Sequence, residues 1–171
     1  MGGVNRTPLL IAATLAVLVI LGIFLFVRQR GTSTASSAST PAATGTLCAN
    51  PPAAATGLTN ASVTALKLED TKEGSGPQAI TSNTVRVNYI GRTVDGKEFD
   101  SSCKAGRTPF EFQLGGGQVI PGWDSGIVGM RVGGVRRLII PANLAYGNRS
   151  PSADIPPGSA LIFDVELLQI K

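Results

Sequence analysis

The sequence predicts an α+β domain, in which an antiparallel β-sheet wraps around one short helix, preceded by a single transmembrane helix. Three observations predict this arrangement. Residues 9–27 carry no charge, residues 31–60 contain neither charged nor aromatic side chains, and from Ser62 onward alternating, β-branched segments are separated by Gly, Pro and Asp turns. We therefore expect a membrane anchor over residues 1–30, a flexible linker over residues 31–61 and a folded domain over residues 62–171.

The apolar run of residues 9–27, which begins with Leu9 and ends with Val27, has the length of a membrane span. As a helix it would extend over about 28 Å, close to the thickness of a bilayer core. A cleavable signal peptide has a shorter apolar region followed directly by small residues, whereas Arg28-Gln29-Arg30 follows here. A buried core helix would carry a polar stripe, which this run lacks. We predict an uncleaved anchor; the alternative is that the run is removed and the domain is secreted.

The charges around the anchor do not decide its orientation, because Arg6 and the terminal amine precede the run and Arg28 and Arg30 follow it. The position of the anchor at the N-terminus favours an extracytoplasmic domain. Cys48 and Cys103 lie on the same side of the anchor, where an oxidising compartment would let them pair. The sequence leaves a disulfide and two free thiols equally open, since it does not give the Cα separation that a disulfide requires.

Residues 31–60 have almost nothing to bury against a core, because they consist largely of Ala, Ser, Thr, Pro and Gly. Such a composition is typical of a disordered tether. We therefore expect this segment to be a flexible tether between the anchor and the domain.

Charge and composition exclude several function classes. Three of the 15 basic residues, Arg6, Arg28 and Arg30, flank the anchor, so twelve remain in the domain against 11 acidic residues. A domain so close to neutral lacks the basic surface of a nucleic-acid-binding protein. The chain has no His and two Cys, which excludes His-dependent nucleophilic catalysis and provides no cluster for zinc or iron–sulfur. We expect no cofactor, no metal and no nucleic-acid partner.

Five strands dominate the predicted domain: residues 63–73, 84–93, 110–114, 135–140 and 160–170. Residues 94–97 read Val-Asp-Gly-Lys and predict a hairpin turn, in which Gly96 takes a positive φ. One short helix is predicted over residues 123–130, entered from Pro121-Gly122 and left at Gly133-Gly134.

The aromatic residues gather next to Gly, Pro and Asp at the edges of these segments rather than in strand interiors. The positions concerned are Phe99-Asp100, Phe110, Phe112, the run from Val119 to Trp123, Tyr146 and Ile155. Segment edges converge at one end of a sheet, so this placement predicts an apolar concave site. Any one of these residues fits a core equally well, but the set as a whole does not.

Four consecutive blocks then identify a family resemblance: VRVNYIGRTVDGKEFDSS, FEFQLGGGQVIPGWDSGIVGM, LIIPANLAYGN and IPPGSALIFDVELL. In order and spacing they resemble the FKBP-type peptidyl-prolyl cis-trans isomerases, over a region that excludes the anchor and linker. The resemblance implies a half-wrapped antiparallel sheet of about five strands around one short helix, with the active site between them. It implies rotamase activity on X-Pro bonds, a chaperone-like role in the folding of exported proteins, and binding of macrolides such as tacrolimus. We expect a monomer.

Carried over residue by residue, the family pocket corresponds to Tyr89, Phe99, Asp100, Phe110, Val119, Ile120, Trp123, Tyr146, Ile155 and Phe163. The resemblance assigns catalysis to Phe99, Asp100, Trp123 and Tyr146, and substrate binding to the other six. It places Trp123 under the proline ring and makes the Tyr146 hydroxyl and the Ile120 N–H donors to substrate carbonyls. Asp100 is expected to hold the pocket through hydrogen bonds rather than to act as a nucleophile.

Two departures from the family pattern affect the rim. Between Ser102 and Pro109 the chain reads CKAGRT, so the Arg that often partners the pocket Asp is not at its usual place, and Arg107 is the candidate replacement. Ser150 stands where the family commonly has Gly, and Asp154 where an apolar residue often covers the site. We interpret both as ordinary loop variation that alters rim contacts.

Such a pocket needs no acid, base or metal. Rotation of an X-Pro bond is slow because amide resonance is lost, a barrier of about 18–20 kcal/mol. An apolar cavity disfavours the charge-separated planar amide, and hydrogen bonds that fit the twisted amide lower the barrier by differential binding. A non-catalytic module of the same fold, which binds proline-containing segments, is the alternative hypothesis.

Overall fold

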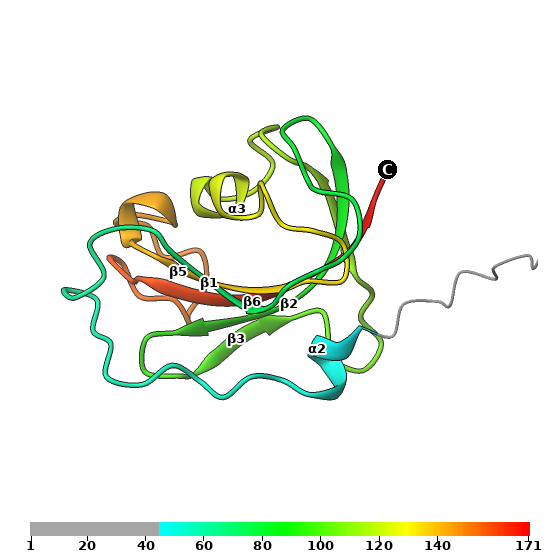
Figure 1. Ribbon diagram of the computed structural model, residues 1–171. Coiled ribbons are helices and arrows are strands. Elements are labelled where there is room, and N and C mark those ends of the chain that lie inside the picture. Colours follow the sequence, from blue (N-terminus) through cyan, green and yellow to red (C-terminus); the bar gives the residue numbers. More distant parts are fainter. Residues whose placement is uncertain (1–44) are drawn as a thin grey trace, which may run out of the picture. The chain divides into compact units, whose positions relative to one another are not determined.

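The computed structural model describes residues 45–171, so the predicted membrane anchor and the first part of the predicted linker lie outside the described residues. Within residues 45–171, no helix combines the length and apolarity needed to cross a membrane. An antiparallel sheet forms the centre of this region, and the short helix α3 (Pro121–Gly126) lies on one of its faces (Figure 1).

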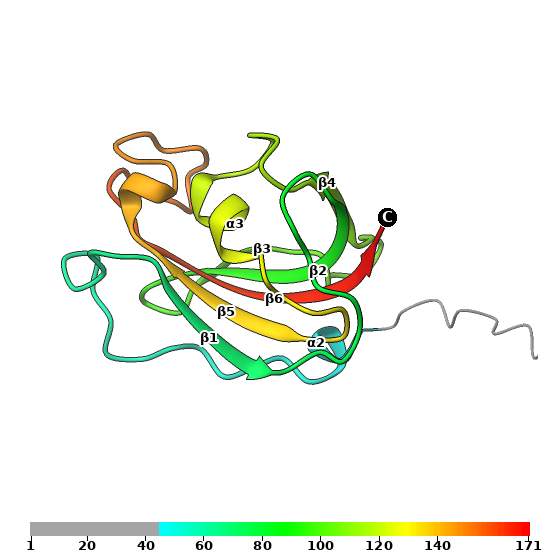
Figure 2. The same ribbon diagram turned by 45° about the horizontal axis from the view of Figure 1, so that its top comes forward.

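Six strands build the sheet. In chain order the elements are α2 (Thr46–Ala49), β1 (Lys67–Lys72), β2 (Thr84–Thr93), β3 (Glu98–Ser101), β4 (Phe110–Gln113), α3, β5 (Val135–Ile140), the 3-10 helix η1 (Ala142–Leu144) and β6 (Leu161–Ile170). The strand order is β1-β5-β6-β2-β3, and β4 also pairs with β2 (Figure 2). Every pairing is antiparallel. The sheet therefore curves around α3 as the family resemblance implied, with six strands instead of about five.

Four of the six strands follow the prediction closely, whereas β1 and β3 do not. β2 and β5 have the predicted bounds, and β4 and β6 differ from them by one residue. β1 begins only at Lys67, because Val63 packs against Ile139 and Ile162 in a separate apolar cluster instead of joining the sheet. β3 was not among the predicted strands; its four residues are too few to show a period of two.

The predicted hairpin joins β2 to β3. Gly96 has a φ of +87° and its N–H donates to the Thr93 carbonyl at 2.9 Å, while the Thr93 N–H donates to the Lys97 carbonyl at 3.0 Å. This turn places Phe99 and Asp100 of β3 directly beside the C-terminal half of β2, which is how two of the predicted site residues reach the sheet.

The helix differs from its prediction over residues 123–130. α3 begins at Pro121, whose fixed φ and missing N–H suit a first helical position, and ends at Gly126. Residues 127–130 form a turn instead, with Gly129 at a φ of +87°. α3 approaches β5 closely because Gly122 has no side chain; a Cβ there would lie 2.5 Å from the Ile140 side chain.

The main core lies between α3 and the sheet. It is formed by alternate residues of the central strands together with Trp123, Ile127 and Met130: Val85 and Val87 of β2, Leu138 and Ile140 of β5, and Leu161, Phe163, Val165 and Leu167 of β6. This packing fixes the position of Trp123, which contributes both to the core and to the site described below.

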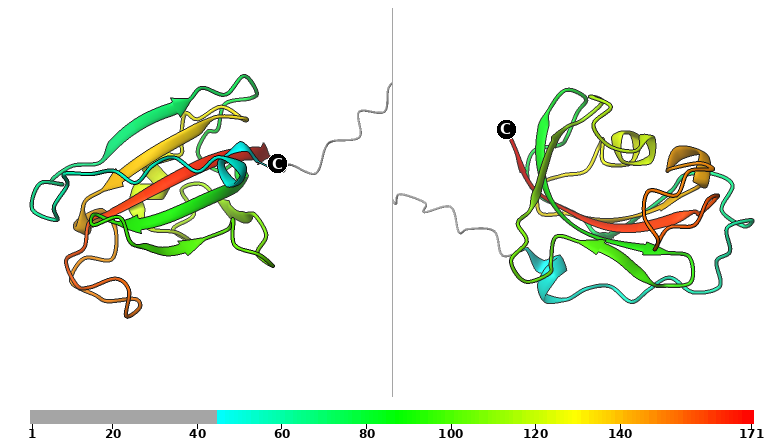
Figure 3. Two further views of the ribbon diagram at one scale, coloured as in Figure 1. Left: turned by 90° about the horizontal axis from the view of Figure 1, so that it is seen from below. Right: turned by 180° about the vertical axis from the view of Figure 1, so that it is seen from behind.

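Residues 45–61, hereafter the N-terminal strap, cross the face of the sheet opposite α3 (Figure 3). Leu47 is 1% exposed and packs with Ile90 and Val135, while Ala55 and Leu58 pack on a second apolar cluster. A disulfide joins Cys48 to Cys103, with a Cα–Cα separation of 5.1 Å. The strap therefore differs from the flexible linker that its composition predicts, because a few apolar side chains, hydrogen bonds to Glu166 and Arg137, and one covalent bond hold it.

Candidate functional site

A cavity of about 280 Å³ opens beside α3. Residues from β2, β3, β4, β6, α3 and two loops line it: Tyr89, Phe99, Asp100, Phe110, Gln118, Val119, Ile120, Trp123, Tyr146 and Phe163. Most of these side chains are aromatic or aliphatic, and few are polar. The lining has the composition of a site that binds an apolar group and orients it with a small number of hydrogen bonds.

Trp123 forms the centre of the aromatic lining. Its ring centroid lies 5.3 Å from that of Tyr89, 5.2 Å from that of Phe163 and 6.2 Å from that of Phe110, in edge-to-face arrangements. Its side chain is 4% exposed. Each such ring pair contributes about 0.5–1.5 kcal/mol beyond area burial, so these contacts stabilise the lining without a ligand.

Gly91 of β2 is a site residue that the sequence reasoning missed. A Cβ at this position would lie 2.7 Å from the Phe163 ring and 2.8 Å from the Phe99 ring. The two rings, whose centroids are 5.5 Å apart, can pack edge to face over β2 only because no side chain stands between them. A glycine inside a strand interior was the available signal.

The Asp100 carboxylate is held by three donors. The Tyr89 hydroxyl donates to Oδ2 at 2.6 Å, and the Arg107 guanidinium and the Ser101 N–H donate to Oδ1 at 2.7 and 2.9 Å. Arg107 thus occupies the place of the expected Arg partner. Because the pair is 57% and 38% exposed, it contributes little to stability, and its effect is to orient the carboxylate.

Both tyrosines of the cavity remain protonated at neutral pH. Burial, followed by the hydrogen bond to Asp100, raises the pKa of Tyr89 well above its ordinary value. Burial, followed by the negative charge of Asp100, also raises the pKa of Tyr146. Each hydroxyl is therefore a hydrogen-bond donor.

The hydroxyls of the two tyrosines differ in their hydrogen bonding. The Tyr89 hydroxyl is bonded to Asp100, whereas the Tyr146 hydroxyl has no partner among residues 45–171. The Ile120 N–H, at the start of α3, is also unpaired within this part of the chain. A peptide in the cavity would therefore meet two free donors next to an apolar surface. The indole Nε1 of Trp123 is the one buried side-chain nitrogen or oxygen of the described residues without a partner.

Nine of the ten predicted pocket residues line the cavity; the exception is Ile155. Ile155 is 4% exposed and belongs to the core cluster. Gln118 lines the cavity but was not predicted, although it directly precedes Val119 in the recognised block. Its side-chain carbonyl accepts the Gln113 N–H at 2.9 Å, which joins the end of β4 to the rim.

Ser150 and Asp154, which depart from the family pattern at the rim, both lie in the loop before β6. The Ser150 hydroxyl lies 2.8 Å from the Ser152 carbonyl and 2.9 Å from the Ile155 carbonyl, so it stabilises the loop internally. Asp154 pairs with Lys97 of the β2–β3 turn at 2.7 Å. This side chain faces a neighbouring loop and does not cover the cavity, which explains how an acidic residue is accommodated there.

Within residues 45–171, no group of acidic, Cys or His side chains has the arrangement of a metal site. Comparison with known proteins then decides the family. The sequence model of FKBP-type peptidyl-prolyl cis-trans isomerases matches residues 76–168. The chain belongs to this family. All cavity-lining residues of this FKBP-type domain lie inside the matched region.

Relatives of this FKBP-type domain include proteins of different lengths. It is 53% identical over 109 residues to FK506-binding protein 4 of Aspergillus fumigatus, covering 64% of this chain and 22% of the fungal protein. It is 51% identical over 107 residues to an FK506-binding protein of Streptomyces anulatus, covering 61% of this chain and 86% of that protein. The chain thus spans about a fifth of the fungal relative's length.

Solved structures show the same fold. The crystal structure of AtFKBP13 matches with a TM-score of 0.58 and 40% identity, over 62% of this chain and 93% of that one. The crystal structure of FkpA from Escherichia coli matches with a TM-score of 0.56 and 46% identity, over 63% of this chain and 49% of that one.

Proposed function

We propose that the chain catalyses cis-trans isomerisation of X-Pro bonds in protein substrates, with the reaction taking place in the cavity around Trp123. The observation that carries this proposal is the combination of an apolar cavity with two donors at its edge, the Tyr146 hydroxyl and the Ile120 N–H, that have no partner within the described part of the chain. Family membership and the two FK506-binding relatives support it.

The chemistry follows from the amide itself. No bond breaks during isomerisation; the barrier of about 18–20 kcal/mol arises from lost resonance when the C–N bond twists. An apolar wall formed by Tyr89, Phe99 and Phe163 removes water that would stabilise the planar, charge-separated amide. Donors aimed at carbonyls of the twisted peptide bind that geometry more strongly than either planar form.

The residues take distinct parts in this mechanism. Trp123 forms the floor on which the proline ring rests, and Val119 with Phe110 forms the rim. Asp100, with both carboxylate oxygens already hydrogen-bonded, fixes the orientation of Tyr89 and contributes a negative potential near the amide. It acts through position and charge rather than as a base or nucleophile.

An isomerisation assay on a proline-containing peptide tests the proposal with the full chain, Trp123→Ala and Asp100→Ala. The parent is expected to accelerate exchange, and loss of the floor is expected to abolish most of that acceleration. A parent that binds the peptide but exchanges it at the uncatalysed rate would show a binding module of the same fold, and would refute the enzyme assignment.

Binding of macrolides is a second expected property of the same cavity. The relatives from Aspergillus and Streptomyces are named FK506-binding proteins, and nine of the ten residues that the family resemblance assigns to the pocket line the cavity. Tacrolimus is expected to inhibit turnover and to raise the melting temperature. If it does neither, the cavity does not have the proposed ligand preference.

We further propose that residues 9–27 anchor the chain in a membrane with the isomerase domain on the extracytoplasmic side, where it would act on exported proteins. The uncharged 19-residue run and the Cys48–Cys103 disulfide support this location, since disulfides persist in oxidising compartments. Membrane fractionation, with mass analysis of the mature N-terminus, tests it. A domain recovered in the soluble fraction with residues 1–30 missing would contradict the anchor.

A further inference from the structure

The disulfide lies at the junction between the N-terminal strap and the wall of the cavity. We propose that Cys48–Cys103 is a thiol–disulfide exchange site, and that its reduction by an external dithiol detaches the strap and loosens the wall that carries Tyr89 and Asp100. The activity consequence rests on the proposed isomerase function, whereas the exchange reaction and the loosening do not.

A hollow gives a reductant access to the bond. Its volume is about 240 Å³, it lies on the strap side of β2 and β3, and both cysteines line it together with Arg92, Glu98 and Lys104. Each cysteine is half-buried, so its sulfur is within reach of a small thiol or of a protein loop. The charges around the hollow are balanced, because Lys104 pairs with Glu98 at 3.3 Å and Arg92 pairs with Asp164 at 2.8 Å. Neither carboxylate is left unpaired to repel a thiolate, which is the reactive form in exchange.

The external dithiol is the reductant in this exchange. One of its thiolates attacks a sulfur of the pair, the Cys48–Cys103 bond breaks as a mixed disulfide forms, and the released sulfur leaves as a thiolate that takes up a proton. The second thiol of the reductant loses its proton and attacks the mixed disulfide. The reductant is oxidised to a disulfide, and Cys48 and Cys103 end as thiols.

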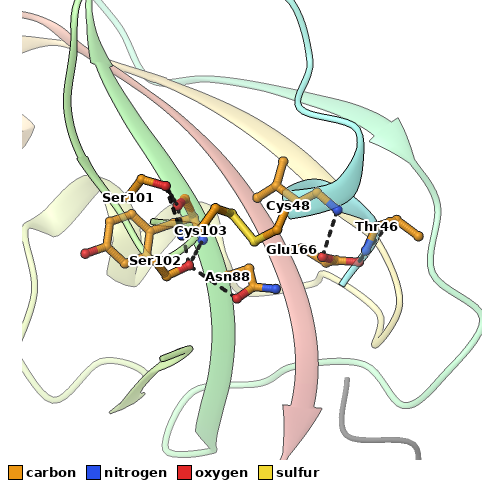
Figure 4. Close-up of a disulfide and its surroundings, with 9 residues drawn as sticks. Thr46, Cys48, Asn88, Ser101, Ser102, Cys103 and Glu166 are labelled. Atoms are coloured by element: carbon orange, nitrogen blue, oxygen red, sulfur yellow. Dashed lines mark hydrogen bonds between the residues drawn. A yellow bond between two sulfur atoms is a disulfide. The ribbon is translucent and has the colours of Figure 1, made fainter. Parts of the chain in front are cut away.

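On the strap side, the bond holds a helix that is too short to persist alone. α2 has four residues, well below the length at which isolated helices are stable. Besides the disulfide, α2 is attached through buried Leu47 and through Glu166, whose carboxylate accepts the Thr46 N–H and hydroxyl at 2.8 Å each and the Leu47 N–H at 3.0 Å (Figure 4). A longer bond of 3.5 Å runs from the Lys72 ammonium to the Thr46 hydroxyl. Once the crosslink is gone, each docking of α2 must overcome the conformational entropy of a free chain end.

On the cavity side, two consecutive hydrogen bonds connect Cys103 to Tyr89. The Cys103 N–H donates to the Ser101 hydroxyl oxygen at 3.0 Å, and that hydroxyl donates to the Tyr89 carbonyl at 3.1 Å. The Ser102 hydroxyl accepts the Tyr89 N–H at 2.9 Å and lies 3.2 Å from the Asn88 side chain (Figure 4). These bonds fix the end of β3 against β2, and the Tyr89 hydroxyl in turn holds Asp100. Freeing Cys103 therefore loosens the segment that positions the wall.

The test treats the oxidised full chain with dithiothreitol in the absence of denaturant and counts free thiols by alkylation and mass. Two alkylated cysteines are expected, with faster amide hydrogen exchange at residues 46–50, at Tyr89 and at residues 101–103. The kcat/KM for a proline-containing peptide is expected to fall by about fivefold or more, the range of an allosteric coupling. Reoxidation should restore the original exchange rates and turnover.

Two variants serve as controls. The double variant Cys48→Ser/Cys103→Ser should reproduce the reduced state and should not respond to dithiothreitol. Glu166→Gln weakens the strap attachment while leaving the crosslink, so it should speed amide exchange at residues 46–47 without affecting Tyr89. If the double variant does not fold, the reversible reduction of the parent chain still decides the question.

The outcomes separate this inference from the isomerase proposal. Absence of alkylation under native conditions overturns the exchange site. Alkylation with unchanged exchange at Tyr89 and unchanged kcat/KM overturns the coupling to the cavity. An oxidised chain without turnover refutes the isomerase function, while the amide exchange at Tyr89 still confirms or refutes the loosening.

Discussion

The two faces of the central sheet bury their polar groups in opposite ways. On the face toward α3, Phe163 and Val165 of β6 pack in an apolar core, and at its edge the Tyr146 hydroxyl and the Ile120 N–H have no partner within residues 45–171. On the opposite face, Asp164 and Glu166 are fully or almost fully buried beneath the strap. The comparison shows that unpaired groups occur where a ligand is expected, whereas the face that only stabilises the fold pairs its charges.

Asp164 illustrates the second case. Its Oδ1 accepts Arg137 Nε at 2.7 Å, and its Oδ2 accepts Arg92 at 2.8 Å and a second Arg137 nitrogen at 3.1 Å. Arg137 also donates to the Ala53 carbonyl of the strap at 2.6 Å. A buried carboxylate is tolerated only with such complete pairing, because an unpaired buried charge is strongly destabilising.

The largest expected effect comes from breaking this pairing. Asp164→Asn leaves two largely buried guanidinium groups without a full counter-charge and should lower the free energy of unfolding by about 3–5 kcal/mol. Because Asp164 faces away from the cavity, kcat/KM per folded molecule should not change. Urea unfolding and the isomerisation assay measure the two quantities. Glu111→Gln, which removes a solvent-exposed ion pair to Lys171, is the matched control and should cost less than about 1 kcal/mol.

On the cavity face, a substitution is expected to lower turnover and to leave stability nearly unchanged. Tyr146→Phe removes a hydroxyl that makes no hydrogen bond among the described residues 45–171, so stability should change by less than about 1 kcal/mol. The kcat/KM should fall by about tenfold, corresponding to the loss of one transition-state hydrogen bond. A variant that loses stability but keeps its turnover would show that Tyr146 has a structural role only.

The pH dependence of stability tests the cavity side of this comparison, because the chain contains 2 tyrosines and both line the cavity. Their raised pKa values mean that the unfolded chain releases phenolic protons near pH 10.0, while the folded chain still retains them. Stability should therefore be fully present below pH 10.0 and fall as the pH rises above it. Phenolate absorbance during an alkaline titration measures this directly; ionisation of both groups at their ordinary pKa would contradict their burial.

The smallest effect is expected at the rim. Lys97 and Asp154 form an ion pair in which both side chains are at least half exposed. Lys97→Gln should leave the melting temperature unchanged, since exposed pairs are screened by water and salt. A clear loss of turnover in this variant, reproduced when the parent is assayed in high salt, would show instead that the loop before β6 must be held in place for substrate binding.

The sequence predicted the elements whose signal is local. β2 and β5 have long runs of β-branched and alternating residues, so their bounds could be read directly. β3 has only four residues, and α3 begins at a proline that the prediction placed outside the helix. Ile155 was assigned to the pocket, although the loop before β6 turns it into the core. These differences arise where tertiary packing, and not periodicity, sets the conformation.

The order of the four family blocks determined the fold, the family and nine of the ten lining residues, because each block encodes a strand, turn or helix start with its own local preference. Only the tertiary structure decided that Cys48 and Cys103 pair, that Arg107 reaches Asp100 and that residues 45–61 cover the sheet. Those contacts join segments whose local sequences carry no preference for one another, and they form because the folded sheet brings the partners within bonding distance.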